Sequence, residues 1–128
     1  MSHDAYMVID TGGPDGPAIV LDIGNYTRNV SPMWRAAMTA AAEQLGHDWR
    51  GESRSDAQMY IDDTQGMTGA DALPLFRAAE AWMEDHATEM RELEPSNGWG
   101  DFEGALEYVA KCRRACVAHP KATLDWSV

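Results

Sequence analysis

The order of apolar and polar positions predicts a β-hairpin at the start of the chain. Residues 5–10 are rich in strand-forming side chains, and residues 18–23 form a short apolar run of the same length. Residues 11–17 between them have the composition of a turn. Because a nearly continuous apolar run is typical of a strand covered on both faces, we expect the second strand to be central in its sheet.

A helix is predicted from Ser31, a serine cap followed by Pro32 in the first turn, to Gly46, which can end it. Its apolar stripe has helical spacing and should lie on the sheet. The stripe consists of Trp34, Ala37, Met38, Ala41 and Leu45.

Two further helices are predicted in the second half of the chain. One begins with either Thr68 or Asp71 as its cap. The helical pattern continues or restarts through Ala87 to Leu93, and Glu94-Pro95 ends it. Its stripe is Leu73, Phe76, Ala79 and Met83. The other helix begins near Asp101 and ends at His119-Pro120. Its buried face should comprise Phe102, Ala105, Leu106, Val109, Cys112 and Cys116.

The remaining segments complete a small α+β domain. Residues 47–55 are polar and aperiodic, which indicates a surface loop, and residues 59–61 are expected to be a short extended piece. Residues 122–128 alternate, with Leu124, Trp126 and Val128 on one side, as in a half-buried strand. The pattern therefore predicts one domain over residues 1–128, with a small antiparallel sheet packed against three to four helices.

Composition narrows the classes of partner. The 128 residues carry a formal net charge of −11, which disfavours direct binding to nucleic acid or to an anionic membrane face. No apolar run approaches the roughly 20 residues that span a bilayer, and no charged-then-apolar leader follows Met1, so a cytoplasmic location is expected. Cys112 and Cys116 share a helical face and are interpreted as reduced core residues.

The run from Pro95 to Asp101 is the most distinctive stretch of the chain. Gly98 and Gly100 bracket Trp99, and Asn97-Gly98 is a strong turn signal. Two interpretations remain open: Trp99 plugs the end of the core, or the free amides and the indole bind a ligand or partner. Acidic residues at the start of the next helix weigh against a phosphate there.

A second polar cluster follows the predicted hairpin. Asn25, Thr27, Arg28 and Asn29 could simply satisfy loop amides, or they could form a recognition surface in which Arg28 supplies a positive charge. The loops 24–30 and 95–101 both lead into helices and could converge. The candidate ligand- or partner-binding residues are therefore Asn25, Thr27, Arg28, Asn29, Asn97 and Trp99.

No motif for catalysis, metal or cofactor stands out. The four histidines are scattered without ligand spacing, no serine lies in a Gly-x-Ser-x-Gly turn, and the Gly12-Gly13 loop lacks the spacing of a phosphate loop. The sequence thus predicts no cofactor, no metal and no catalytic residue.

Three runs together resemble a known family. They are Ile9-Asp10-Thr11-Gly12-Gly13-Pro14, Gly24-Asn25-Tyr26-Thr27-Arg28-Asn29-Val30-Ser31-Pro32-Met33-Trp34 and Glu94-Pro95-Ser96-Asn97-Gly98-Trp99-Gly100. The chain is similar in these runs to small uncharacterised proteins encoded by bacteriophages of actinobacteria and by related prophages. The resemblance implies a phage origin and carries over no functional residue.

The leading functional hypothesis is a phage accessory protein, located in the cytoplasm of the infected bacterium, that binds a host or host-defence protein without catalysis. One alternative is a small-molecule-binding protein or enzyme that uses a polar corner between residues 24–30 and 95–101. An acidic DNA mimic and a virion component are further alternatives. The sequence does not address self-association.

Overall fold

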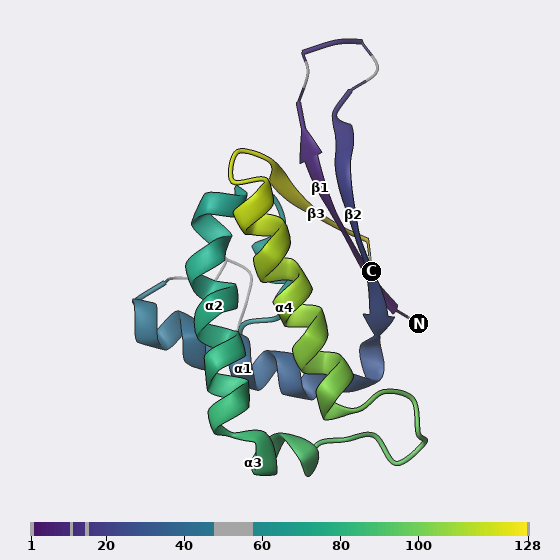
Figure 1. The fold of residues 1–128 in the computed structure, drawn as a ribbon, viewed down its shortest axis with the longest axis vertical. Helices are drawn as coiled ribbons and strands as arrows, with labels where there is room; N and C mark the ends of the chain where they lie inside the picture. Colours follow the sequence, from purple (N-terminus) through teal and green to yellow (C-terminus); the bar gives the residue numbers. More distant parts are fainter. Residues whose placement is uncertain (1, 11, 15, 48–57, 128) are drawn as a thin grey trace.

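The computed structural model describes residues 2–10, 12–14, 16–47 and 58–127 (Figure 1). Over these residues it contains three strands, four α-helices and two short 3-10 helices. Their order is β1 (Ser2–Ile9), β2 (Ala18–Thr27), η1 (Arg28–Val30), α1 (Ser31–Leu45), η2 (Ile61–Thr64), α2 (Gly69–Asp85), α3 (Ala87–Arg91), α4 (Phe102–Ala118) and β3 (Thr123–Ser127). The predicted α+β class is confirmed.

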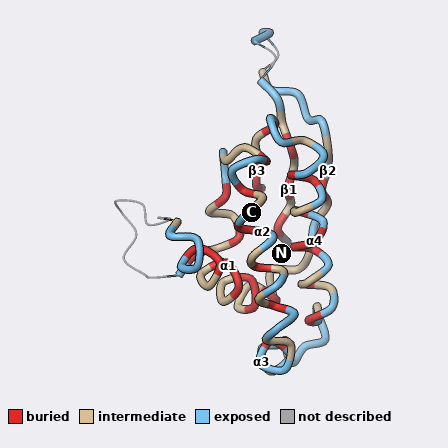
Figure 2. Tube along the Cα trace, turned by 60° about the vertical axis from the view of Figure 1, so that its left-hand side comes forward, coloured by how far each residue is buried: buried red, intermediate tan, exposed pale blue. Residues whose placement is uncertain are grey.

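The sheet is antiparallel, with the strand order β2-β1-β3. The predicted hairpin and the final strand are both present, but the expectation that residues 18–23 form the central strand was wrong. β1 is central and β2 is an edge strand. Only the inner part of the apolar run is covered, since Ile23 is buried. The far end of the hairpin projects beyond the helices (Figures 1 and 2), and Ile19 is 62% exposed. Val20 and Ile23 are each skipped in the pairing with β1, so two irregularities of the bulge type interrupt this edge.

Helix α4 is the element that lies against the hairpin, and α2 packs on α4 (Figure 1). The prediction that residues 31–45 would lie on the sheet was wrong, because α1 packs mainly against α2. α1 reaches β1 through the ring of Trp34, whose centroid lies 5.5 Å from that of His3. Leu45 is 46% exposed, so the buried stripe of α1 ends before it, whereas Gly46 ends the helix in a left-handed conformation as predicted.

The start of α1 differs from the prediction, whereas the cap of α2 is one of the two residues that the sequence left open. Ser31 is the first residue of α1, and its cap position is taken by Val30, which forms no side-chain hydrogen bond. At α2 the cap is Thr68, whose hydroxyl accepts a hydrogen bond from the Asp71 amide at 3.1 Å. Because α2 begins at Gly69, Pro74 lies inside the helix, where its position is exposed.

The segments between the main elements were harder to predict. Residues 58–60 have no regular structure, and residues 61–64 form η2 in place of the expected extended piece. Residues 48–55 of the predicted surface loop lie outside the described residues, as does Val128. Short apolar pieces such as these contain too few positions to separate a strand from a helical turn.

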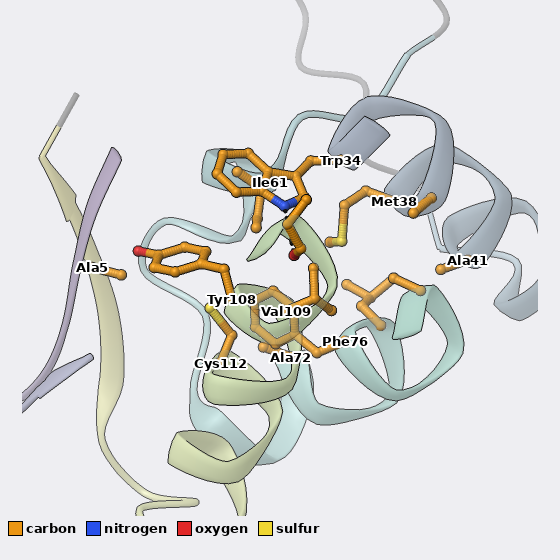
Figure 3. Close-up of a cluster of buried hydrophobic side chains, with 14 of the residues drawn as sticks. Ala5, Trp34, Met38, Ala41, Ile61, Ala72, Phe76, Tyr108, Val109 and Cys112 are labelled. Atoms are coloured by element: carbon orange, nitrogen blue, oxygen red, sulfur yellow. Dashed lines mark hydrogen bonds between the residues drawn. The ribbon is translucent and has the colours of Figure 1, made fainter. Parts of the chain in front are cut away.

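A cluster of five rings joins the sheet to the helices. This ring cluster consists of His3, Tyr26, Trp34, Tyr108 and Trp126. Figure 3 shows Trp34 from α1 and Tyr108 from α4 among the buried side chains that surround them. The Trp34 indole donates to the Ala105 carbonyl at 3.1 Å, and the Trp126 indole donates to the Thr64 hydroxyl at 2.9 Å. Both indole N–H groups are thus satisfied inside the core.

Tyr108 connects α4 to two strands at once. Its hydroxyl lies 2.9 Å from the Gly24 carbonyl of β2 and 3.3 Å from the His3 carbonyl of β1, and its single hydrogen is shared between these two acceptors. Burial raises the pKa of this phenol well above its ordinary value, so it remains a donor throughout the physiological range.

Tyr108→Phe should therefore lower the free energy of unfolding by about 1 to 2 kcal/mol, because a buried hydrogen bond is lost while the ring is kept. Tyr6→Phe is the matched control, since the Tyr6 hydroxyl has no hydrogen-bond partner among the described residues. It should change stability by less than about 0.5 kcal/mol. Urea denaturation of the three proteins measures both effects, and equal midpoints for the two variants would contradict the assignment.

Candidate functional site

The two predicted site segments do meet, although the first is not a loop. Asn25 and Thr27 belong to β2, and Arg28 and Asn29 form η1, so the expectation that residues 24–30 leave the sheet as a loop was wrong. Residues 95–101, here called the Trp99 turn, join α3 to α4 and approach the end of β2. The contact is made by Tyr26 and Thr27.

Tyr26 provides the central contact of this junction. Its hydroxyl accepts a hydrogen bond from the Asp101 amide at 3.2 Å and can donate to the Asp101 carboxylate at 3.4 Å. The same carboxylate caps α4 by accepting from the Gly104 amide at 2.7 Å. The end of β2 and the start of α4 are therefore fixed through one tyrosine and one aspartate, and the sequence analysis did not single out Tyr26.

Two glycines make this close approach possible. A Cβ on Gly104 would lie 1.9 Å from the Tyr26 hydroxyl oxygen, and a Cβ on Gly100 would lie 2.6 Å from the Thr27 methyl group. Gly100 also has a φ of 101°, which side-chain-bearing residues rarely adopt. Gly100 and Gly104 therefore let the turn and the start of α4 pack against β2, whereas Gly98 has nothing within 4 Å of its Cβ position and only permits the turn.

Trp99 itself is mostly exposed to solvent. The residue is 67% exposed, so the interpretation that it plugs the end of the core was wrong. The turn is nevertheless ordered by its own hydrogen bonds, since the Trp99 amide donates to the Asn97 side-chain oxygen at 2.9 Å. The Trp99 indole is thus exposed to solvent on a short turn that hydrogen bonds stabilise.

The polar cluster after the hairpin divides between two places. The Thr27 hydroxyl accepts from the Asn29 amide at 3.3 Å and from the Asn29 side chain at 3.1 Å, so these two residues cap η1 locally. Asn25 is exposed and pairs with Asp4 in the ladder. Arg28 lines a separate pocket, which no residue of the Trp99 turn lines.

This second feature is an open pocket of about 560 Å³. It lies between β1, η1, the start of α1 and the segment around η2. Its lining residues are His3, Arg28, Ser31, Trp34, Arg35, Tyr60, Ile61 and Asp62. Apart from Arg28, the sequence analysis missed its polar members, because four separate segments supply them and no local spacing connects them. The seven-residue interval between Arg28 and Arg35 is the one sequence signal that could have pointed there.

Two sets of titratable groups respond to burial. The pKa of His3 is lowered, first by burial and also by the positive charge of Arg28, while Asp62 and Asp4 act in the opposite direction. Burial also raises the pKa of the Cys112 thiol, and it raises that of Cys116 to about 12. Both cysteines are free and buried, which confirms their interpretation as reduced core residues and leaves them protonated at neutral pH.

No protein-family model, curated protein or solved structure matches the chain. Within the described residues, no helix is long and apolar enough to cross a membrane. The described residues therefore offer two candidate functional surfaces, the Trp99 turn and the pocket at Arg28.

Gly104→Ala should destabilise the protein by about 1 to 3 kcal/mol, because the added methyl group displaces Tyr26 from Asp101. This sign is opposite to the usual stabilising effect of alanine in a helix. In a Tyr26→Ala background the same substitution should be neutral or stabilising, since the clash is gone. A double-mutant cycle by urea denaturation measures the coupling, and additive effects would argue against the contact.

His3 should give stability a dependence on mildly acidic pH. Its folded-state pKa lies below the ordinary value of 6.5, so on acidification the unfolded chain is protonated at a higher pH than the folded chain. The free energy of unfolding should therefore decrease as the pH falls below about 6.5. His3→Phe keeps a ring beside Trp34 and Trp126 and should flatten the dependence between pH 7 and 5. The His3 imidazole should titrate below 6.5 by NMR, and a midpoint above 6.5 would refute the assignment.

Proposed function

We propose that this protein is a non-catalytic phage accessory protein that binds a host or host-defence protein through the Trp99 turn. The observation that carries the proposal is the 67% exposure of Trp99 on a turn that is hydrogen-bonded internally and seated on β2. Tryptophan is enriched among the residues that dominate protein–protein binding energy.

The order of the turn supports this use. A side chain on a mobile loop must be immobilised when it binds, which costs free energy. Here Gly100 packs against Thr27, and Asp101 is bonded to Tyr26, so the backbone on the far side of Trp99 is already in place. Association would then order little beyond the indole itself.

The surrounding charge indicates the kind of surface that would fit. Glu92, Glu94 and Asp101 are exposed near the turn in a chain of net charge −11, and Leu93 adds a second apolar side chain at 40% exposure. A complementary partner would offer an apolar pocket for the indole with a basic rim. Arg91 changes this balance little, because it is paired with Glu103 at 2.9 Å.

The proposed setting rests on the resemblance to actinobacteriophage proteins, whose most specific run is the Trp99 turn with its flanking residues. A phage protein that acts on a host protein would work in the cytoplasm of the infected bacterium. The acidic surface is compatible with a basic partner protein and disfavours direct contact with nucleic acid.

The test is a pull-down from an actinobacterial host lysate with tagged wild-type protein, Trp99→Ala and Val117→Ala. Val117 is the control because it is also apolar and 54% exposed, on the last turns of α4. We expect a protein that the wild type and Val117→Ala retain and that Trp99→Ala loses by tenfold or more, the loss typical of a hot-spot residue. Recovery of no partner, or equal recovery by all three proteins, would contradict the proposal.

A further inference from the structure

We propose that the pocket lined by His3, Arg28, Ser31, Arg35 and Asp62 binds a small hydroxylated molecule through a phosphate or carboxylate group. This site is independent of the Trp99 turn. The inference rests on two observations: the pocket is lined by two arginines that form no ion pair with any described residue, and its volume is suited to a small ligand.

The arginines make the pocket positive in an otherwise acidic protein. Within the described parts of the chain neither Arg28 nor Arg35 forms an ion pair, and Asp62 is the one acidic residue that lines the pocket with them. Arg35 is held over the ring of Tyr60, with 5.5 Å between the guanidinium carbon and the ring centroid. Guanidinium groups suit phosphate and carboxylate because their N–H groups can bind two oxygens at once.

His3 lines the inner side of the pocket and contains a polar atom that the described residues leave unsatisfied. The residue is 5% exposed, and its Nδ1 atom has no hydrogen-bond partner among the described residues. Buried polar atoms are rarely left unpaired, and the neighbouring rings of Trp34, Tyr108 and Trp126 all have their polar hydrogens satisfied. Since Nδ1 is shielded from the pocket in this structure, an anion bound there would act on the imidazole through its charge and not through a hydrogen bond to Nδ1.

The start of α1 adds a favourable field. Ser31, the first residue of this 15-residue helix, lines the pocket, and the first turn contains no acidic residue and no side-chain cap. The amino end of a helix carries partial positive charge, which favours an anion placed beside it. The contribution here is the field alone at the first two residues, because the Ser31 amide donates to the Arg28 carbonyl and Pro32 has no amide hydrogen. The net charge of −11 opposes this only weakly, since salt screens distant charges beyond roughly 8 Å at physiological ionic strength.

The size and polarity of the pocket suggest a ligand larger than a bare anion. A volume of about 560 Å³ lies within the range of small-molecule sites. Asp62 cannot bind the anionic group, because two negative charges repel. Its carboxylate can accept hydrogen bonds from hydroxyl groups, so a sugar phosphate or a hydroxylated carboxylate matches the lining better than inorganic phosphate alone.

The experiment is a titration of the full chain with ribose 5-phosphate, gluconate, inorganic phosphate and neutral ribose at constant ionic strength, followed by calorimetry and by the His3 imidazole signal in NMR. We expect saturable binding of ribose 5-phosphate or gluconate, which separates a phosphate from a carboxylate ligand. Ribose should not bind detectably, and inorganic phosphate should bind more weakly than the preferred probe. The bound anion should also raise the midpoint of the His3 titration, because it favours the charged imidazole.

Matched variants make the result specific to the pocket. Arg28→Gln and Arg35→Gln should each weaken binding by about tenfold or more, the loss expected for one charge-assisted hydrogen-bonded pair. Arg77→Gln removes the same charge from an exposed position on α2 and should leave affinity unchanged. The proposal is overturned if neither ribose 5-phosphate nor gluconate binds saturably, or if Arg77→Gln weakens binding as much as the pocket variants do.

Discussion

A buried tyrosine or tryptophan needs a hydrogen-bond acceptor for its polar hydrogen. In this chain, those hydrogen bonds set how the helices pack against the sheet. Tyr108 of α4 donates to backbone carbonyls of both β1 and β2, and Trp34 of α1 donates to the backbone of α4. Trp126 of β3 donates to Thr64 in η2. The ring cluster therefore determines the relative positions of the sheet, α1, α4 and the segment around η2, and α2 closes the core from the other side of α4 (Figures 1 and 3).

Each candidate surface is connected to a member of the ring cluster. Tyr26 packs its ring against Trp34 and Tyr108 while its hydroxyl reaches Asp101, so the rigidity of the core extends to the Trp99 turn. His3 packs its ring edges against Trp34 and Trp126 and lines the pocket that contains Arg28 and Arg35. One surface presents an exposed indole and the other presents positive charge. This difference is why we assign them different ligands, a protein partner and a small anionic molecule.

Periodicity was sufficient for the elements that bury a regular stripe. The alternation of Leu124 and Trp126 and most of the buried face of α4 were predicted from spacing, because each element is half covered along its length. On α4, however, the predicted Leu106 is only half-buried, and the buried Tyr108 was not predicted. Spacing did not predict the position of β2 in the sheet. An apolar run such as Ile19 and Val20 does not show whether other elements cover it, and both residues are exposed. Spacing also failed for both candidate surfaces. Tyr26 and Asp101 are 75 residues apart, and His3 and Arg35 line the same pocket only because the tertiary fold brings β1 and α1 together, which no local pattern encodes.

The central claim is that the tyrosine and tryptophan rings of the core donate their polar hydrogens to acceptors inside the protein, while Trp99 is left in solvent. Exchange of the indole N–H hydrogens in deuterated water tests it most directly, with each NMR signal assigned by a Trp→Phe variant. The account predicts that the Trp34 and Trp126 signals persist long after the Trp99 signal has disappeared, because the first two are buried donors and the third belongs to an exposed residue. A Trp99 signal that persists as long as that of Trp34, or a Trp34 signal lost together with that of Trp99, would contradict it.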